Sequence, residues 1–400
     1  MKVLFVIDSI HCGGISTSLM PLLSQLSRYA ACDLLVFDPD GAEKFHRIPE
    51  GVHLLKTNWL LRLMACTDEA LNRRPMIRLF RWLLGKWTRL FGLESARRMA
   101  FGFAPGQKGY DAAVAYRQDE KDRLCPGIND YVRYRVKARL KLTYFHADME
   151  ETRYYNGRPG RRREFDYILC VSEGCREHFV RFCPHLQERV TVCENFVDTD
   201  SILAKAAVPF AYPADKFILF TACRLCPAKA LPRALRAMDR LAEREDFLWY
   251  IAGDGPEREE IEAIIAGSAF LSRHVILLGY AENPFPYMAG ADVLFLPSRH
   301  EASPVVLKEA RVLGIPLLTT DCCGARELVE DPGAGLVCEN SEEGIRDALE
   351  RVLGDKALLR QFRRAPGENA VNCRAEAQMQ AMLRLLEERL TPQREKNRAE

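Results

Sequence analysis

The fold is decided by residues 292–324, which read DVLFLPSRHEASPVVLKEARVLGIPLLTTDCCG. Residues 293–296 form a short apolar run, typical of a buried parallel strand, and Pro297 ends it. Residues 315–319 form a second run of the same kind. With a helix between them, the stretch predicts one strand, helix and strand of an open α/β sheet.

The helix between these strands has clear start and stop signals. Ser303 is a favoured N-cap residue, and Pro304 fits the first helical position because the N–H it lacks would have no partner there. Apolar residues then recur at helical spacing until Gly314, a common residue just after a helix. The loop of residues 299–303 therefore lies at the carboxyl edge of the sheet, where open α/β proteins bind ligands.

Two carboxylates of this unit can face one crevice. Glu301 lies in the loop, and Glu309 follows eight positions later, inside the helix. The helix amino terminus beside Glu301 is a ready site for an anionic ligand. The alternative is that Glu301 is an ordinary loop charge and that Glu309 is solvated.

The pair and its spacing resemble the E-x7-E signature of the retaining glycosyltransferases of the family 4 type, which have the GT-B architecture. The resemblance extends from Met1 to about Leu390. It implies an α/β fold with two Rossmann-like domains facing a central cleft and a last helix that crosses back to the first domain. It also implies a hexosyltransferase of bacterial polysaccharide or glycolipid synthesis.

Length and a hinge-like segment predict the domain boundaries. A chain of 400 residues is long for one core, so we expect two domains. Residues 194–198, ENFVD, resemble the family's N-x-V-D hinge, and a polar turn follows. We predict an acceptor-side domain at 1–197, a nucleotide-sugar-binding domain at 198–375, and a helix and charged tail at 376–400.

Charge and hydropathy limit the kinds of partner and the cellular location that we expect for this protein. The chain has 57 basic and 55 acidic residues, so no field of the whole molecule favours nucleic acid. The apolar run after Lys2 is too short for a signal peptide, and no run approaches the roughly 18 residues of a membrane span. We therefore expect a cytoplasmic protein.

The chain has 14 cysteines, mostly scattered among apolar neighbours, which fits buried thiols in a reducing compartment. Cys223 and Cys226 form C-x-x-C, and residues 322–323 are both cysteine, so a zinc site is conceivable. The second C-x-x-C or histidine pair that such sites normally need is absent. We favour buried thiols.

The first domain opens with a strand at residues 3–7 and a loop that delivers Gly13 and Gly14 before a helix. The loop lacks both G-x-G-x-x-G and the P-loop pattern, so a plain turn and a close approach to a ligand stay open. Its placement resembles the family's amino-terminal glycine loop, near the donor phosphates. His146 begins an HAD segment that resembles the family's HD-like segment facing the donor sugar, although a structural histidine is the common alternative.

The second domain opens with a strand at residues 217–221 and a loop that carries Arg224 and Lys229. Two bases at a strand's carboxyl end can neutralise a diphosphate. The loop resembles the family's G-R-L-x-x-x-K-G pattern, and Gly253 opens a segment that resembles G-x-G-P. Three positions depart from the family's glycines, namely Cys223, Ala230 and Cys323.

A helical insertion at about residues 55–103 interrupts the alternation of strands and helices. Between residues 71 and 101 it has eight bases and one acid, Glu94, interleaved with aromatic and aliphatic residues. This pattern suits a helix lying on an anionic membrane, and equally an insertion packed on its own domain with a solvated basic face. A second basic run, at residues 158–163, is a solvated loop or a site for the phosphate of a lipid-linked acceptor.

The resemblance implies a role for each site residue. Arg224, Lys229 and the helix start at Ser303, Pro304 and Val305 neutralise the diphosphate of a UDP- or GDP-linked sugar. Glu309 binds the ribose, Glu301 lies by the sugar, and His146 holds a donor hydroxyl. No cofactor or metal is implied, and the D-x-D pairs at residues 38–40 and 198–200 are expected to be turn residues.

Three other functions are alternatives to a glycosyltransferase. A Rossmann oxidoreductase lacks its glycine fingerprint. A sugar-nucleotide epimerase of GT-B shape would bind the donor but needs acid and base groups around the sugar, and the E-x7-E pattern argues against it. A catalytically silent subunit that binds sugar nucleotides remains an alternative because of the three departures from the family's glycines.

Overall fold

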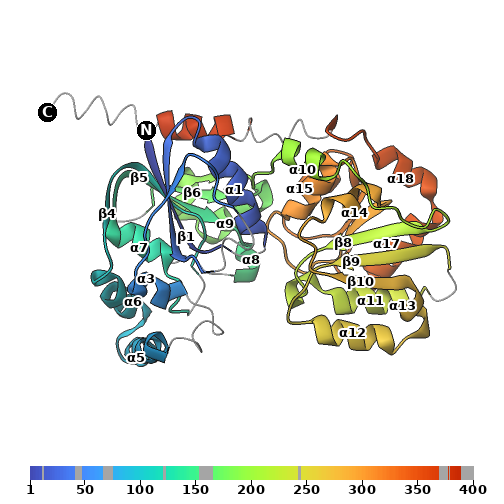
Figure 1. Ribbon diagram of the computed structural model, residues 1–400, viewed down its shortest axis with the longest axis horizontal. Coiled ribbons are helices and arrows are strands. Elements are labelled where there is room, and N and C mark those ends of the chain that lie inside the picture. Colours follow the sequence, from blue (N-terminus) through green and yellow to red (C-terminus); the bar gives the residue numbers. More distant parts are fainter. Residues whose placement is uncertain are drawn as a thin grey trace. The chain divides into compact units, whose positions relative to one another are not determined.

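A computed structural model describes residues 1–10, 13–40, 47–65, 75–119, 123–152, 165–241, 245–368, 377 and 379–388. The chain divides into two compact units, each with its own sheet (Figure 1). Residues 1–171, 175–195 and 376–400 form the first unit, and residues 172–174 and 196–375 form the second. The basic run at residues 158–163 lies outside the described residues.

The first unit is built on a seven-stranded sheet with the order β3-β2-β1-β4-β5-β6-β7. Every neighbouring pair described in it is parallel. The strands are β1 (Lys2–Ser9), β2 (Ala31–Asp38), β3 (Val52–Leu54), β4 (Gln107–Ala115), β5 (Val136–Phe145), β6 (Tyr167–Cys170) and β7 (Val190–Val192).

Helices connect these strands, and most of the described residues of the predicted insertion are helical. The helices are α1 (Gly14–Leu26), α3 (Trp59–Ala65), α5 (Pro75–Phe91), α6 (Leu93–Gly102), α7 (Ile128–Arg135), α8 (Met149–Thr152) and α9 (Glu173–Phe182), with a 3-10 turn η1 (Pro184–Arg189). Within the insertion, α3, α5 and α6 follow one another between β3 and β4.

The core of the first unit lies on both faces of its sheet. Residues 3–7 of β1 are all buried, which is why this strand reads as a continuous apolar run rather than an alternating one. On one face, Leu4 and Val6 share a cluster with residues of α3, α6 and α7. Residues 379–388 are also helical and belong to this unit, which confirms the predicted return of the last helix.

The second unit has a six-stranded sheet with the order β10-β9-β8-β11-β12-β13, and its described pairs are again parallel. The strands are β8 (Phe217–Ala222), β9 (Phe247–Ala252), β10 (Val275–Gly279), β11 (Val293–Leu296), β12 (Leu317–Thr320) and β13 (Gly335–Cys338). Chain order reverses direction between β8 and β11, so their carboxyl ends form a topological switch point.

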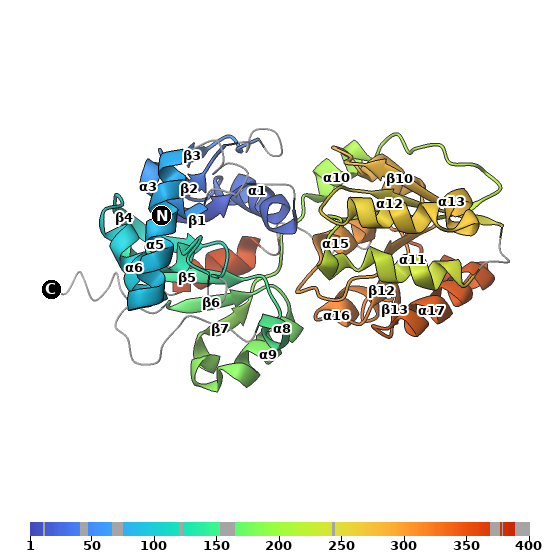
Figure 2. The ribbon, with the colours of Figure 1, turned by 90° about the horizontal axis from the view of Figure 1, so that it is seen from below.

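The helices of this unit are α10 (Thr199–Lys205), α11 (Leu231–Asp239), α12 (Arg258–Ala266), α13 (Ala269–His274), α14 (Phe285–Gly290), α15 (Val305–Val312), α16 (Ala325–Val329), α17 (Glu342–Gly354) and α18 (Lys356–Phe362). Figures 1 and 2 show α11, α12 and α13 together on one face of the sheet. Helices α10, α14 and α15 lie on the other face.

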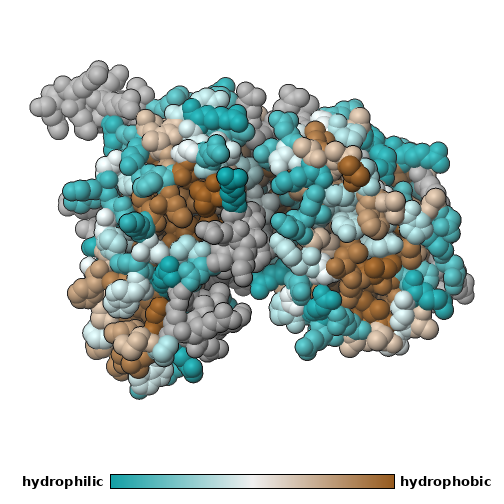
Figure 3. Space-filling view, viewed as in Figure 1, coloured by the Kyte–Doolittle hydropathy of each residue, from teal (hydrophilic) through white to brown (hydrophobic). Residues whose placement is uncertain are grey.

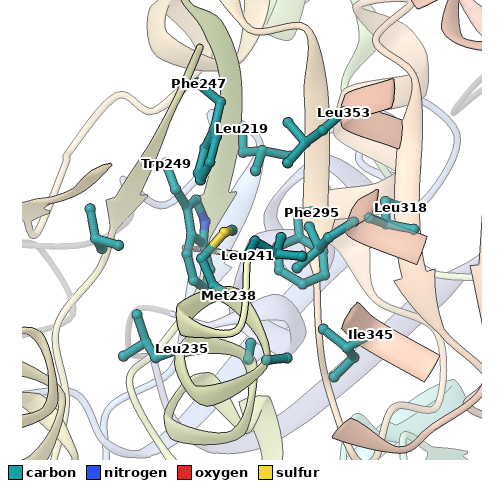
Figure 4. Close-up of a cluster of buried hydrophobic side chains, with 14 of the residues drawn as sticks. Leu219, Leu235, Met238, Leu241, Phe247, Trp249, Phe295, Leu318, Ile345 and Leu353 are labelled. Atoms are coloured by element: carbon teal, nitrogen blue, oxygen red, sulfur yellow. The ribbon is translucent and has the colours of Figure 1, made fainter. Parts of the chain in front are cut away.

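In the second unit, alternate residues of the strands contribute to two separate hydrophobic cores, one on each face of the sheet. Leu219 and Trp249 pack with α11, α12, α13, α17 and α18, in the cluster drawn in Figure 4. Ile218 and Phe220 point the other way and pack with α10, α14 and α15. Because successive side chains of a strand point to opposite faces, apolar residues at every position indicate a sheet covered on both sides.

One predicted helix start is wrong by a single position. Helix α15 begins at Val305, and Pro304 itself is the N-cap residue, with an extended backbone (φ −68°, ψ 116°). Ser303, the predicted N-cap residue, lies one residue before it. The predicted stop is confirmed, since the helix ends at Val312 and Gly314 adopts the left-handed conformation with φ 71°.

None of the helices within the described residues is both long and apolar enough to cross a membrane.

Candidate functional site

The loop after β11 places Glu301 beside Lys229, a residue 72 positions away in sequence. The ammonium of Lys229 donates a hydrogen bond to the Glu301 carboxylate, and the two side chains form a largely buried ion pair. The backbone N–H of Arg299 donates to the carbonyl of Ala228 at 2.8 Å, which holds the 3-10 turn η2 (Pro227–Lys229) against the loop. Two of the predicted site residues therefore meet at the carboxyl edge of the second sheet.

This contact stabilises the protonated, charged form of Lys229. Burial opposes the charged ammonium, but the adjacent Glu301 carboxylate outweighs it and raises the pKa of Lys229 above its ordinary value. The lysine is therefore charged throughout the physiological range. A cation fixed at this edge can attract a phosphate while it also holds the loop carboxylate.

Ser298 orients the Glu301 carboxylate and was missed by the sequence analysis. It is fully buried, and its hydroxyl donates to the same carboxylate oxygen that Lys229 contacts, at 2.7 Å. The carbonyl of Ser298 accepts hydrogen bonds from the Thr320 hydroxyl and, at 3.1 Å, from the Cys322 thiol. A single loop serine carries no local signal of this role.

Two further residues outside the predicted set tie the surrounding loops together. The amide of Asn340 donates to the carbonyls of Arg299 at 2.9 Å and Asp321 at 3.2 Å. The buried guanidinium of Arg233 donates to the Asn340 side chain at 2.7 Å and to the carbonyl of Pro297 at 3.1 Å. This clamp of Arg233 and Asn340 joins the loops that follow β11, β12 and β13.

Glu309 lies in the second turn of α15 and is half-buried. Burial raises the pKa of its carboxyl to about 7, against a small lowering by Lys205 at the end of α10. At neutral pH this carboxyl exists in both protonation states, and it can accept or donate a hydrogen bond.

Glycine is required where the turn after β9 passes the loop after β8. A Cβ at Gly253, whose φ is 150°, would lie 1.8 Å from the carbonyl oxygen of Cys223, and one at Gly255 would lie 2.3 Å from that of Leu225. The N–H of Leu225 donates to the carbonyl of Asp254 at 3.0 Å. These contacts fix the backbone on both sides of Arg224, whose side chain is exposed.

Ala230, which stands where the family pattern has a glycine, adopts a backbone conformation that favours glycine. Its φ of 53° and ψ of 33° lie in the left-handed region, and no other non-glycine residue among those described has a positive φ. The departure from the pattern therefore leaves the turn before α11 intact, with strain in the backbone instead of a different path. Lys229 precedes this residue and is presented by the turn.

The structure describes the surroundings of Cys223 and of one aspartate of each acidic pair. Burial raises the pKa of Cys223 to about 12, and Cys223 and Cys226 share no cluster of three potential metal ligands there. Asp198 caps α10 by accepting a hydrogen bond from the N–H of Ser201 at 3.0 Å. Asp40 forms an ion pair with Arg62 at 3.0 Å.

The remaining predicted residues lie at the carboxyl edge of the first sheet. Gly13 is exposed and has open space around it, and Gly14 begins α1. His146 follows β5, and its backbone N–H donates to the Gln118 side chain at 2.9 Å. Its ring lies against those of Tyr144 and Tyr116, at centroid distances of 5.3 and 5.1 Å.

His146 is neutral at physiological pH. Burial, reinforced by the cation of Arg117, lowers the pKa of the imidazole to about 3. In the described part of the chain neither ring nitrogen has a well-formed hydrogen bond. The imidazole can therefore bind a hydroxyl group, but it cannot act as a cationic acid.

The carboxyl-terminal half of the chain matches a known protein family. Residues 206–396 match the family described as glycosyl transferases group 1. The lipopolysaccharide core biosynthesis glycosyltransferase LpsE of Rhizobium meliloti is 26% identical over 197 residues, which cover 49% of this chain and 56% of that protein. A diphospho-undecaprenol N-acetylgalactosaminyltransferase of Campylobacter jejuni is 32% identical over 200 residues, covering 50% and 53%. The chain thus spans about half the length of these curated relatives.

Solved structures show the same fold over nearly the whole chain. The Anabaena protein HepE, in complex with UDP and glucose, has a TM-score of 0.66 at 17% identity, covering 97% of this chain and 100% of that one. The sucrose-phosphate synthase of Thermosynechococcus elongatus has a TM-score of 0.66 at 16% identity, covering 97% and 99%. The two parallel α/β units are therefore those of a GT-B fold, and the segment of residues 206–396 that matches the group 1 glycosyl transferases includes Glu301 and Lys229.

Proposed function

We propose that this protein is a retaining glycosyltransferase of the family 4 type. It moves a sugar from a UDP- or GDP-linked donor to a lipid-linked or saccharide acceptor in the synthesis of a cell-surface polysaccharide or glycolipid. The observation that carries the proposal is the ion pair of Lys229 and Glu301 at the carboxyl edge of the second sheet, inside the segment that matches the group 1 glycosyl transferases.

Cationic groups at this edge suit the diphosphate of such a donor. Lys229 is a charged, partly accessible ammonium, and the exposed guanidinium of Arg224 adds a planar fork of donors. The amino terminus of α15 at Ser303, Pro304 and Val305 contributes its backbone dipole. With these partners the diphosphate needs no divalent cation, so we propose a metal-independent reaction.

The carboxylates serve the sugar nucleotide in different ways. Glu309 exchanges hydrogen bonds with the ribose hydroxyls, which its poised pKa permits. Glu301 lies by the sugar and stabilises positive charge at the anomeric carbon. The neutral His146 accepts or donates one hydrogen bond to a donor hydroxyl.

The transfer breaks the bond between the anomeric carbon and the diphosphate oxygen and forms a bond from that carbon to the acceptor oxygen on the same face. The leaving phosphate takes the acceptor proton, so charge and protons balance without an enzyme nucleophile. Ser298 and Lys229 both hold the carboxylate of Glu301 through hydrogen bonds, which suits an electrostatic role better than nucleophilic attack.

The similar proteins support the donor and acceptor classes. Solved structures of HepE contain UDP or UDP-glucose, and the name of the Campylobacter relative specifies a diphospho-undecaprenol acceptor. We propose a nucleotide sugar donor and a lipid-linked acceptor on this basis. A cytoplasmic enzyme attached to the inner membrane face would reach such an acceptor.

The test is turnover of a panel of UDP-, GDP- and ADP-linked sugars with a lipid-linked acceptor, with the anomeric configuration of the product read by NMR. We expect one donor class to be used with retention. Glu301→Gln should lower kcat by about 100-fold or more with UDP or GDP binding preserved. Glu350→Gln, an exposed change on α17, is the matched control.

Two results would contradict the proposal. An inverted product would remove the retaining mechanism. Tight nucleotide-sugar binding without transfer or hydrolysis for any donor would favour the catalytically silent subunit instead.

A further inference from the structure

Helix α5 (Pro75–Phe91) exposes an apolar face that the described residues of its own unit do not cover. Leu84 is its one buried residue, with Ile77, Arg81 and Thr88 half-buried on the same side. The other large apolar side chains of the helix are exposed, and Leu90 reaches 76% exposure. The exposed apolar residues of the helix are Met76, Leu79, Phe80, Trp82, Leu83, Trp87, Leu90 and Phe91.

These residues form one surface, which we call the α5 face. At 3.6 residues per turn, seven of them fall in a continuous arc about 120° wide, and Trp82 lies about 60° beyond one edge of it. Trp59 of α3, also exposed, extends the surface through its ring contact with Phe80 at 5.3 Å. Figure 3 shows brown and tan atoms over the end of the first unit where Figure 1 places α5.

The charge beside the α5 face has a single sign. Arg78, Lys86 and Arg89 are exposed and follow the edge of the arc, and the ammonium of Lys86 lies 3.8 Å from the ring centroid of Trp82. Helix α5 has no acidic residue. Arg81 faces the packed side of the helix, so it is not part of this basic edge.

We propose that the α5 face docks the protein on an anionic lipid bilayer. The apolar arc enters the boundary between headgroups and acyl chains, the tryptophans lie at headgroup level, and the three bases contact lipid phosphates. A second copy of the chain fits less well, because pairing through this face would bring two identical rows of bases together. The inference deepens the membrane location proposed above and does not need the transfer reaction.

The experiment measures binding of the full-length chain to vesicles of phosphatidylglycerol and phosphatidylcholine. Wild-type protein should sediment with the anionic vesicles at low salt and be released at high salt. Three of the four tryptophans, Trp59, Trp82 and Trp87, lie on the α5 face, whereas Trp249 is buried in the second unit. Brominated lipid should therefore quench most of the accessible tryptophan emission.

Two sets of variants separate the apolar and the basic contributions. Replacing Arg78, Lys86 and Arg89 by Gln should weaken binding to anionic vesicles about 100-fold, at roughly tenfold or less per base. Leu83→Asp with Leu90→Asp should abolish it. The controls change exposed residues of the same unit elsewhere: Lys108→Gln with Lys137→Gln for charge, and Phe182→Asp for apolar surface.

The proposal is wrong if wild-type protein does not bind anionic vesicles at low salt, or if both α5 variants bind as wild type does. It is also wrong if the wild type forms a dimer that the two aspartates dissociate while vesicles stay unbound. UDP affinity, measured on every variant by calorimetry, reports the second unit separately. Loss of vesicle binding with unchanged UDP affinity assigns the defect to the α5 face. The proposed transfer reaction is tested separately, by the turnover assay described above.

Discussion

Lys229 binds the Glu301 carboxylate in the structure, and in the proposed reaction it also binds the diphosphate of the donor. A hydrogen bond to a charged group contributes roughly 1.5–3 kcal/mol. Lys229→Ala should therefore weaken UDP binding by about 10- to 100-fold and leave uridine binding unchanged, because the nucleoside has no phosphate. Calorimetry with both ligands measures this, with Lys216→Ala as control. Equal losses for UDP and uridine would remove Lys229 from the phosphate site.

Glu309 makes the stability of the protein depend on pH. Its pKa is about 7 in the folded chain against an ordinary value of 4.5, so the folded state binds the proton more tightly. The stabilisation is complete below about pH 4.5 and is lost as the pH rises through about 7, with an upper limit of about 3 kcal/mol.

Glu309→Gln removes this titration. Urea unfolding of wild type at about pH 5 and 8 should show a larger loss of stability with pH than the variant shows, because glutamine has no proton to release. Parallel pH profiles for the two proteins would show that Glu309 does not titrate in this range.

Ala230 tests whether the turn before α11 requires the left-handed conformation. Glycine adopts it without penalty, so Ala230→Gly should leave the free energy of unfolding within about 1 kcal/mol of wild type. A β-branched side chain is far less compatible, and Ala230→Val should destabilise by about 2 kcal/mol or more. Chemical denaturation compares the three proteins. A valine variant as stable as wild type would mean that the turn rearranges at little cost.

At the scale of elements, the clamp of Arg233 and Asn340 joins three loops of the second unit. Asn340→Ala removes the amide contacts to the carbonyls of Arg299 and Asp321 and leaves Arg233 without its side-chain partner. We expect a loss of about 1–3 kcal/mol in unfolding free energy, together with a lower kcat, because the Glu301 loop loses its support.

Asn340→Asp distinguishes the two halves of the clamp. The carboxylate still accepts from Arg233 but cannot donate to the loop carbonyls, so stability should be restored more fully than kcat. Urea titration and turnover are measured on both variants. If kcat recovers in step with stability, the clamp has only a structural role and does not position Glu301.

At the scale of the whole molecule, the acidic pairs are divided between the two units, and each is engaged in local structure. Asp40 pairs with Arg62 in the first unit, and Asp198 caps α10 in the second. We expect transfer to continue after exhaustive chelation. Activity that disappears with chelator and returns with magnesium or manganese would contradict metal independence and direct attention back to these aspartates.

The sequence by itself determined the kind of fold and most of its elements. Strands covered on both faces must be continuously apolar, so β1, β8 and β11 were recognisable as runs. Helix α15 was recognisable because Gly314 accepts a left-handed conformation at its end. These signals act over a few residues. The predicted ends of elements can differ from the observed ends by one or two positions. The start of α15 was predicted at Pro304 and lies at Val305, because neighbouring residues can satisfy the same capping preference.

Only the tertiary structure decided which residues meet. Lys229 and Glu301 are 72 positions apart, and Arg233 and Asn340 are 107 apart, so no local pattern connects them. Ser298 and Asn340 have no signal at all, because a buried serine and a loop asparagine acquire their roles from the strands that bring their neighbours close. The same limit applies to α5. Its amphipathic pattern suits a packed helix and a membrane helix alike, and only the placement of Leu84 against the unit leaves the other face exposed to water.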